Sequence, residues 1–488
     1  MKKQILFLFA ALFLGLAATA QTVSFDLKAE GKGTNKTDSP QFIGCDNQRI
    51  VLVESTGLIK TRLSLVSYSL DQQELARVEL GSGKETSSYG GYINGQYVDL
   101  LRVDQTEDSK TKQTSMRVYR DRRKLTTLQP EGEPLVLGNY TGEKGDDFGF
   151  GISVSPNGEL LAGVFVARYA GQGTEIKVSL YNHELEEYWT MSPTKANFNM
   201  VHVTDDGDVI LYALNDNGEC SFTILDGEKE SNIEFTIRPD EGTNILERAF
   251  VRYGNGKIIL ATAVREENHV IMPVGSNMDR VDIHCYNINR HHLSCERHTF
   301  TDQETQRLCN QKEGSSPRHH WVQFGEIAQT LADKDGGYVM IDQVWTVTVN
   351  GSPSERHRCG MMVLRVDADG KILWTRTNRF SATSQWPLRH LLTHRWMATP
   401  QGVMLTWVDH ASNVSAAPSK PYKEYKPGRT KSALNVWIVG PDGKETQSYI
   451  LTGKNSLAGA AHRLDTPGKY VALLSSLRKG QLAFFTIE

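Results

Sequence analysis

The sequence is poor in cysteine. Six cysteines occur among 488 residues, and no two of them form a CxxC pair. A zinc site built on cysteine pairs is therefore not expected, and a chain of this length buries a core large enough to fold without a disulfide framework. Cys285 and Cys295, which flank a predicted hairpin, and Cys309 and Cys359, which lie in or beside predicted long loops, are the disulfide candidates. Buried thiols are the equal alternative.

A strong charge of either sign is also missing. The formal net charge is −3, and it becomes −5 if Lys2 and Lys3 are removed with an N-terminal leader that contains no acidic residue. Such a balance indicates neither nucleic acid nor an anionic membrane as the partner. After the first twenty residues no segment approaches the ~20 apolar residues that span a bilayer, so no transmembrane anchor is expected.

Familiar patterns of catalysis are absent as well. The sequence has no G-x-S-x-G nucleophile elbow and no H-E-x-x-H metalloprotease helix. Residues Asp369–Trp374 resemble the turn and tryptophan of quinoprotein propellers, but those enzymes repeat the motif on most blades and it occurs once here. No cofactor is therefore predicted, and the sequence argues weakly against an enzyme.

A leader is the first feature that is present. Lys2 and Lys3 precede an apolar run from Ile5 to Leu16, and Ala18-Thr19-Ala20 supplies the small-x-small pattern that signal peptidase cleaves. Residues 1–20 are therefore predicted to be a signal peptide, and residues 21–488 a single domain. The leader resembles those of Gram-negative bacteria, which implies an exported protein of the periplasm, the outer surface or the medium.

Short β-strand patterns recur along the rest of the chain. Stretches of four to eight residues rich in β-branched and apolar side chains are bounded by Gly, Asn, Asp or Pro, and no long segment holds a helical period. The stretches are Ile50–Glu54, Leu63–Ser69, Leu160–Val166, Lys177–Tyr181, Val209–Ala213, Lys257–Val264, Tyr338–Val344, Met361–Val366, Val403–Val408, Leu434–Val439 and Tyr470–Ser475. The pattern predicts an all-β protein.

Two families of short turns organise these strands into four-stranded units. Eight turns join the first two strands of each unit, the A and B strands, and nearly all contain Gly: Cys45–Gln48, Ile93–Gln96, Ser155–Gly158, Thr204–Gly207, Tyr253–Gly256, Asp333–Gly336, Thr399–Gly402 and Asp465–Gly468. Seven turns join the last two strands, C and D: Leu70–Gln73, Arg120–Arg123, Asn182–Leu185, Leu225–Glu228, Asn287–Arg290, Asp367–Gly370 and Pro441–Lys444.

The missing eighth C–D turn indicates how the repeat closes. The last unit has no outer strand of its own, whereas Thr22–Lys28 is a strand without a unit. Pairing this N-terminal strand with the last sheet would satisfy both edges. The sequence therefore predicts an eight-bladed β-propeller closed by its N-terminal strand. Seven blades with an irregular insertion, or two β-sandwiches, are the alternatives.

One segment carries a more specific resemblance. Ser155–Ala162 (SPNGELLA) resembles the entry to a strand in TolB-like and WD-type propellers. It covers a single blade, so it implies the β-propeller superfamily and no particular family.

All the long connections are predicted on one face of the disc, opposite the short turns. The long B–C connections are Asp104–Ser115, Ala167–Glu175, Glu266–Val281, Thr348–Cys359 and His410–Ala433, and the long D–A connections are Gly138–Asp147, Thr301–Val322 and Ser381–Arg389. Because long loops in compact domains are commonly functional, this face is the predicted working face. The Lys- and Pro-rich loop Ser415–Ser432 is expected to be a solvated insertion, with docking to an acidic partner as the alternative.

Histidine, aromatic and charged residues in these loops are the candidate ligand-binding residues. They are His319, His320, Trp321, Arg356, His357, Arg389, His390, His394, Trp396, Asp409, His410, Tyr422 and Lys423. Imidazoles and carboxylates suit zinc, but the spacings match no ligand motif, so no metal is predicted.

Two functional hypotheses follow. The first is a binding or scaffold protein of the cell envelope that engages a protein, peptide or glycan on the loop-rich face. The alternative is a polysaccharide hydrolase or lyase with its site at the mouth of the central channel, which would need two carboxylates, or a carboxylate and a histidine, close together.

Overall fold

A computed structural model gives the arrangement of the chain. It describes residues 23–487 with gaps; the undescribed positions inside this span are 28–40, 47, 57–61, 83–85, 109, 144, 156–157, 172, 194–197, 199, 215–218, 228–230, 238–243, 266–276, 289–290, 315–321, 324, 334, 350–351, 386–394, 418, 427–429, 455–456, 464–467 and 476–479. The predicted leader lies outside the described residues.

The described strands form eight four-stranded antiparallel sheets and one two-stranded sheet. The first sheet contains β2 (Gln41–Cys45), β3 (Arg49–Thr56), β4 (Arg62–Ser69) and β5 (Glu74–Ser82), and the second contains β6 (Thr86–Asn94), β7 (Tyr97–Asp108), β8 (Gln113–Lys124) and β9 (Leu135–Glu143). The third sheet contains β10 (Asp147–Val154), β11 (Leu160–Tyr169), β12 (Gly173–Asn182) and β13 (Glu187–Met191), and the fourth contains β14 (Met200–Val203), β15 (Val209–Leu214), β16 (Cys220–Asp226) and β17 (Ser231–Ile237).

The other four sheets complete the chain. They are β18 (Asn244–Gly254), β19 (Lys257–Arg265), β21 (Arg280–Asn287) and β22 (His292–Thr299); β24 (Gly325–Asp333), β25 (Gly336–Val349), β26 (Ser352–Asp367) and β27 (Ile372–Gln385); β28 (Arg395–Thr399), β29 (Gly402–His410), β30 (Lys431–Val439) and β31 (Glu445–Lys454); and β32 (Leu457–Arg463), β33 (Lys469–Ser475), β34 (Gly480–Ile487) and β1 (Val23–Leu27). The two-stranded sheet pairs β20 (Asn277–Met278) with β23 (Val322–Gln323), and the short helices are α2 (Asp302–Leu308) and η3 (Ala411–Ser415).

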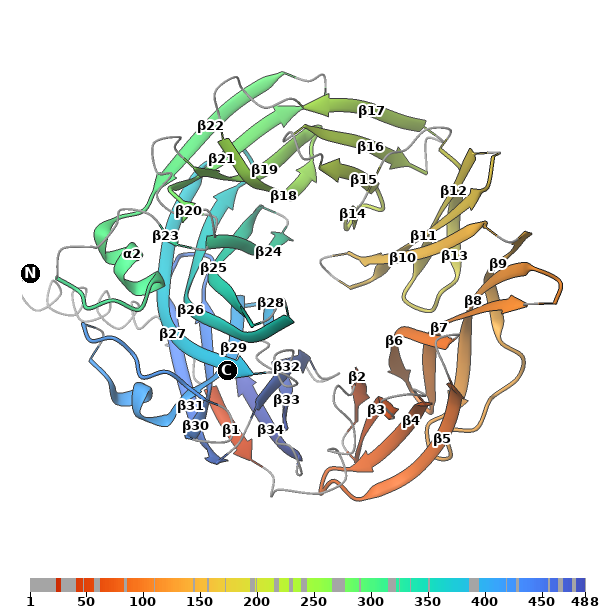
Figure 1. Cartoon of the computed structure of the whole chain (residues 1–488), viewed down its shortest axis with the longest axis horizontal. Coiled ribbons are helices and arrows are strands. Elements are labelled where there is room, and N and C mark those ends of the chain that lie inside the picture. The colour runs from red at the N-terminus through yellow and green to blue at the C-terminus, as the bar shows by residue number, and fades with distance from the viewer. Residues whose placement is uncertain are drawn as a thin grey trace, which may run out of the picture.

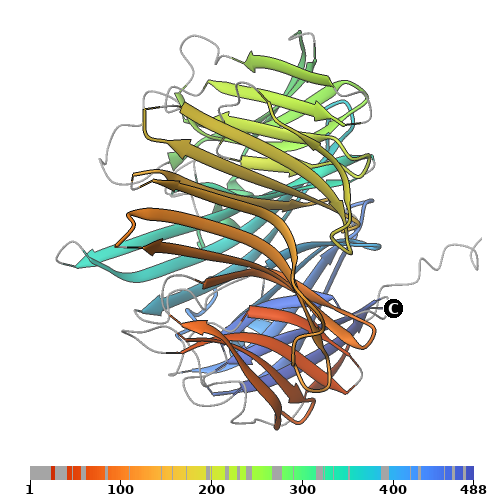
Figure 2. The same ribbon diagram turned by 90° about the vertical axis from the view of Figure 1, so that its right-hand side faces the viewer.

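The four-stranded sheets are arranged around a central axis (Figure 1). The innermost strands are β2, β6, β10, β14, β18, β24, β28 and β32. Viewed from its edge, the ring has strands that run between its two faces (Figure 2). The predictions of an all-β protein and of the β-propeller fold are confirmed. Within the described residues, no helix has the length and apolar content needed to cross a bilayer.

Hydrophobic clusters between neighbouring sheets hold the ring together. The buried Ile50, Leu52 and Tyr68 of the first sheet pack with Val471 of β33, in the last sheet. Equivalent clusters lie at the other junctions around the ring. Alternating strand residues face the two neighbouring sheets, so each sheet contributes to the core on both of its sides.

The N-terminal strand completes the last sheet, as the sequence predicts. β1 pairs antiparallel with β34 from Val23↔Ile487 to Leu27↔Ala483. The predicted A–B turns that are described in full connect the first two strands of a sheet, namely Ile93–Gln96, Thr204–Gly207, Tyr253–Gly256 and Thr399–Gly402. The other four, Cys45–Gln48, Ser155–Gly158, Asp333–Gly336 and Asp465–Gly468, include positions outside the described residues. The glycines of the fully described turns fit the local backbone; Gly95, for example, has a φ of 56°, in the left-handed region that a side chain disfavours.

The predicted C–D turn at Arg120–Arg123 is wrong. Strand β8 continues through it to Lys124, and the connection to β9 spans residues 125–134. Asp121 and Arg123 of this charged run are buried within the sheet, where Asp121 accepts hydrogen bonds from Arg102 Nη1 at 3.0 Å and from Arg123 Nε at 2.9 Å. Ion pairs of this kind allow a buried strand to contain charged residues, so that its composition resembles that of a turn.

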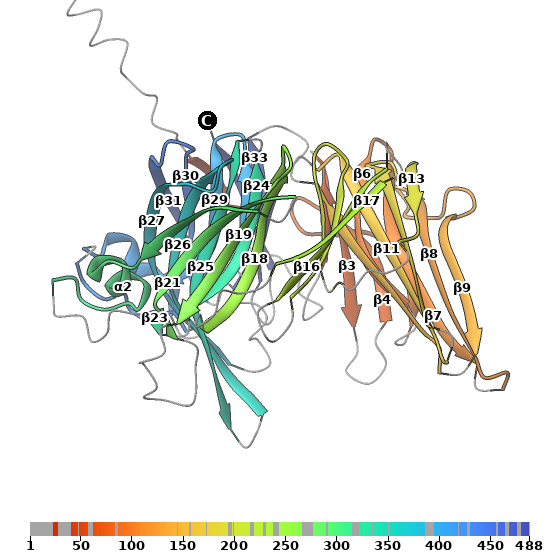
Figure 3. The same ribbon diagram turned by 90° about the horizontal axis from the view of Figure 1, so that it is seen from above.

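In their described residues, five of the predicted long loops are largely strand. The strands extend into Asp104–Ser115, Gly138–Asp147, Ala167–Glu175, Thr348–Cys359 and Ser381–Arg389. These extensions are rich in polar residues; Thr106 and Ser115, for instance, are hydrogen-bonded across the β7–β8 hairpin at 2.6 Å. The β25–β26 hairpin projects well beyond the ring (Figure 3). Backbone pairing here needs no apolar face, so the hydrophobic pattern ends before the strands do.

Candidate functional site

The inner strands enclose a cavity at the end of the channel where the A–B turns lie. Its volume is 680 Å³, and β10, β14, β18, β24 and β28 supply residues to its wall at or near their turns. Its polar lining includes Asp205, Asp206, Arg252, Tyr253 and Asp333. The cavity is therefore at the mouth opposite the predicted working face.

A second cavity, of 510 Å³, continues outward from the first. It lies between the β10–β13 and β14–β17 sheets and is also lined by Asp205 and Asp206, which places the two cavities side by side. Tyr188, Trp189 and Asp226 line its outer part. We call the two cavities together the acidic groove.

The charge of the acidic groove is predominantly negative. Asp205, Asp206, Asp208 and Asp226 contribute carboxylates, whereas Arg252 is the cation in the same lining. Asp333 is already held by Arg365, whose two terminal nitrogens lie 2.9 and 3.0 Å from its carboxylate oxygens. The β14–β15 turn and Asp226 therefore place four carboxylates along the groove.

Two aromatic residues of β13, Tyr188 and Trp189, line the outer end. The Tyr188 side chain is exposed, and Trp189 lies against the β16–β17 turn. A Cβ at Gly227 would overlap the Trp189 indole, so glycine is what allows this close approach. Aromatic faces beside carboxylates suit cationic groups and sugar rings.

His202, which sits in the channel wall, does not oppose the negative charge. Its ring stacks on Tyr212 at 5.5 Å and on Phe250 at 4.7 Å. Burial without a compensating anion lowers the pKa of His202 to about 4, so the imidazole is neutral at physiological pH.

About half of the sequence-predicted site residues cannot be placed. The positions outside the described residues are His319, His320, Trp321, Arg389, His390 and His394. Arg356 belongs to β26, but its side chain is not described. Trp396 is only 2% exposed and packs on Trp437 with ring centroids 5.8 Å apart, and it also contributes to the wall of the 680 Å³ cavity.

The structure does bring the remaining predicted residues together, but at the outer edge of the ring. Asp409 and His410 end β29, while Tyr422 and Lys423 lie in the segment that follows η3. The Asn413 side chain connects the end of β29 to the segment after η3, because its amide donates to Asp409 Oδ1 at 2.9 Å and its oxygen accepts from the Lys423 backbone N–H at 2.8 Å.

The fifth of these residues, His357, lies beside the same segment. Its Nδ1 is 3.4 Å from a carboxylate oxygen of Glu424 and 2.8 Å from the Thr383 hydroxyl. The Tyr425 backbone N–H donates to Ser381 O at 2.8 Å, and its carbonyl accepts from Thr383 N–H at 3.0 Å. The segment is thereby attached to the outer strand β27.

The insertion that contains α2 reinforces this attachment. The Asn310 side chain donates to Tyr422 O at 2.9 Å and accepts from Tyr422 N–H at 2.7 Å. Figure 1 shows α2 on the outside of the ring. In its described central part the predicted loop over residues 415–432 does expose Lys420, Lys423 and Lys426 to solvent, but hydrogen bonds, which composition does not reveal, also attach it to the ring.

All six cysteines are present as thiols, and the strand register explains one of the pairs. Cys295 stands opposite His284, whereas Cys285 stands opposite Ser294. Directly opposed residues share a face, so Cys285 and Cys295 point to opposite faces of their sheet. The candidate pairing across this hairpin is wrong for that reason.

Comparison with known proteins shows similarity of fold only. No protein-family model and no curated protein matches the sequence. Among solved structures, the β-propeller domain of the Trilobed protease from Pyrococcus furiosus is 12% identical, with a TM-score of 0.36 over 83% of this chain and 96% of that one. The polysaccharide lyase Uly1 is 10% identical, with a TM-score of 0.35 over 94% and 99% of the two chains, and the Dos1 propeller is 8% identical, with a TM-score of 0.29 over 69% and 90%.

Proposed function

We propose that this protein is a binding propeller that holds a lysine- or arginine-bearing peptide segment of another protein in the acidic groove. The observation that carries the proposal is that Asp205 and Asp206 line both cavities. An extended segment would lie along the groove with its cations on these carboxylates and an apolar or cationic side chain on Tyr188. The proposal keeps the binding role expected from the sequence and moves it to the opposite face.

Charge neutralisation in the groove tests this function. Short peptides that alternate lysine with glycine are the probe, and serine–glycine peptides of equal length are the neutral reference. We expect the Asp205→Asn/Asp206→Asn variant to bind the cationic peptide about tenfold more weakly, or about 1.4 kcal/mol, because two carboxylates at the centre of the groove lose their charge. Isothermal titration calorimetry at low and high salt measures the difference.

Asp71→Asn provides the matched control, because Asp71 is an exposed aspartate in a turn outside the groove. Its affinity for the cationic peptide should equal that of the unchanged protein. Equal binding of the cationic and neutral peptides, or no effect of the double substitution, would contradict the proposal.

A polysaccharide-acting enzyme is the second candidate, favoured by carboxylates and an exposed aromatic ring in one groove. Such an enzyme needs a carboxyl group available for proton transfer. Asp205 and Asp206, which line both cavities, would supply this carboxyl group. Depolymerisation of neutral or uronate-containing polysaccharides, lost in the same double variant, would favour this candidate.

We also propose that the eight four-stranded sheets are the eight blades of one closed domain spanning residues 21–488. The clusters at the junctions, including the one that joins the last sheet to the first, support this count. Seven blades is the alternative. Removing the closing strand β1 tests the closure.

Export is the remaining proposal. The basic start, the apolar run and Ala18-Thr19-Ala20 support removal of residues 1–20 and a location in the periplasm, at the outer surface or outside the cell. Mass spectrometry of the exported chain should give Gln21 as its first residue, and a chain that retains Lys2 and Lys3 would contradict cleavage.

A further inference from the structure

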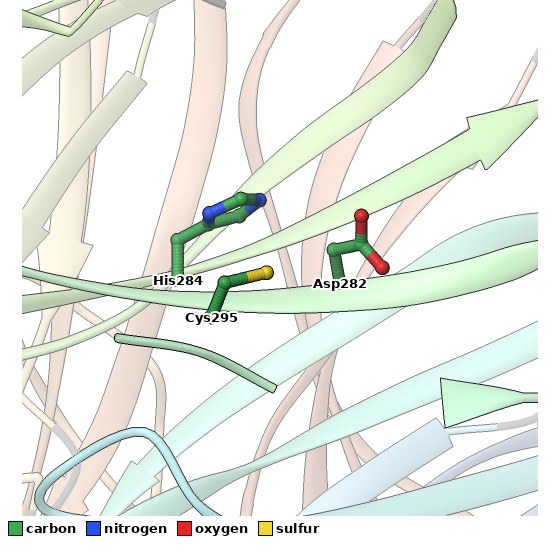
Figure 4. A group of neighbouring side chains, drawn as sticks. All are labelled: Asp282, His284 and Cys295. Atoms are coloured by element: carbon green, nitrogen blue, oxygen red, sulfur yellow. The ribbon is translucent and has the colours of Figure 1, made fainter. Parts of the chain in front are cut away.

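A group of three side chains on the β21–β22 pair is not part of the acidic groove. Asp282 and His284 are two residues apart on β21, and Cys295 stands opposite His284 on β22. Alternation along β21 and direct opposition across the pair put all three on one face. Figure 4 shows the carboxylate, the imidazole and the thiol on the same side of the strands.

The three groups are close enough to share one ion. One ligand atom from each lies within 4.8 Å of the other two. A tetrahedral zinc with bonds of about 2.0–2.3 Å holds its ligand atoms about 3.5 Å apart, so shifts of about 1 Å or less would bring them into place. Thiolate, imidazole and carboxylate are the donors that zinc takes in proteins.

The surroundings protect the group and leave one side open. Asp282 is 2% exposed and His284 8%, whereas Cys295 is half-buried at the outer strand. Tyr286, on the same face, packs toward the β14–β17 sheet, which places the group between two neighbouring sheets. The half-buried thiol marks where an ion would enter.

A second histidine orients the first. His284 Nδ1 lies 3.3 Å from His292 Nε2, with the ring centroids 5.5 Å apart. If His284 donates its Nδ1 proton in this contact, its Nε2 is the nitrogen that carries the lone pair a metal would take. Hydrogen bonds of this kind fix the tautomer of metal-binding histidines.

Two arginines compete with a cation for Asp282 and set the limit on affinity. Arg280 Nε is 3.0 Å from Asp282 Oδ1, and Arg297 Nε is 3.9 Å from Oδ2. A carboxylate has lone pairs for a metal and for Arg280 together. The Arg297 side chain is 65% exposed and can turn into solvent. The Cys295 thiolate and the Asp282 carboxylate would neutralise a divalent charge.

We propose that Asp282, His284 and Cys295 bind one zinc-class divalent cation, with His292 as the orienting residue. The Cys295 thiol loses its proton to solvent on binding, and a water occupies the fourth position. Separations in the sequence do not reveal this site, because it depends on the register between β21 and β22.

Metal titration of the mature chain after chelator treatment tests the site. We expect one Co²⁺ per chain to produce thiolate-to-cobalt charge-transfer absorption, and Zn²⁺ to displace it. Cys295→Ser should abolish the absorption and lower Zn²⁺ affinity at least 100-fold, and His292→Ala should lower it about 10- to 100-fold. Cys285→Ala, which removes the thiol on the other face of β21, should change neither.

Thiol labelling gives a test that needs no substitution. Bound Zn²⁺ should slow alkylation of Cys295 more than tenfold, as located by peptide mass spectrometry, and leave the half-buried Cys309 unaffected. Absence of charge-transfer absorption, its persistence in Cys295→Ser, or unprotected alkylation of Cys295 would each overturn the proposal.

Discussion

A chain that begins at Lys28, without β1, should be destabilised by about 2–8 kcal/mol. Five residues of β1 pair with β34, and a strand pairing of this length makes about five backbone hydrogen bonds worth about 0.5–1.5 kcal/mol each. Their loss also exposes the edge of β34 to other chains. Urea unfolding should show the lower stability, and light scattering should show concentration-dependent association.

Restoring the strand separately distinguishes closure from a general effect of truncation. A peptide of residues 21–30 added to the shortened chain should recover much of the stability, because it supplies the same backbone partners to β34. Ser24→Ala in the full mature chain, at an exposed position of β1, should leave stability unchanged. A shortened chain as stable as the full one would show that the ring does not depend on β1.

Asp409→Asn should stabilise the protein at alkaline pH. Burial raises the pKa of Asp409 from 3.8 to about 8, although its carboxylate accepts hydrogen bonds from His410 N–H and the Asn413 amide. Between these two pH values the folded state keeps a proton that the unfolded state releases. The stability that the protonated Asp409 contributes to the folded state is thus fully present below about pH 4 and is lost as the pH rises to about 8.

The neighbours of Asp409 agree with a neutral acid. Burial also raises the pKa of the Cys359 thiol to about 12 and those of the Tyr422 and Tyr425 phenols, so these neighbouring groups are uncharged as well. A permanently neutral amide of the same shape should fit this site. It would keep the bonds from His410 and Asn413 and avoid the cost of burying a charge.

The pH dependence of the unfolding free energy distinguishes a protonated Asp409 from an ionised one. The difference in unfolding free energy between Asp409→Asn and the unchanged protein should grow by about 1.4 kcal/mol per pH unit from pH 5 to pH 8, and reach about 5 kcal/mol. Urea unfolding over this range gives the slope. Asp335→Asn, at an exposed turn, should show no such slope. A difference that does not vary with pH would mean that Asp409 is ionised in the folded protein.

The sequence was sufficient for the local elements. Glycine-containing A–B turns such as Ile93–Gln96 and the apolar strands that follow them are local signals, because a tight turn requires certain residues and a strand between two sheets requires apolar side chains. The unmatched strand near the N-terminus also predicted its partner, since an edge without a neighbour has few ways to be satisfied.

The sequence pattern gave a wrong prediction where charged residues lie within a strand. Asp121 in β8 has the composition of a turn, yet ion pairs with Arg102 and Arg123 bury it within the sheet. The extensions of β25 and β26 look like a loop because their backbone pairing requires no apolar face. Composition reflects the secondary structure that each residue favours by itself, and it does not reveal the residue with which it pairs in the folded sheet.

The working sites were decided by tertiary structure. The acidic groove depends on inner strands from five different sheets meeting at one channel mouth, and the Asp282–His284–Cys295 group depends on register across a hairpin. His357 and Glu424, far apart in the chain, meet because a long insertion attaches to β27. What the sequence by itself determined about this protein was the repeated strands and turns, which are local. The closeness of residues from different repeats is not local, and only the closed ring determines it.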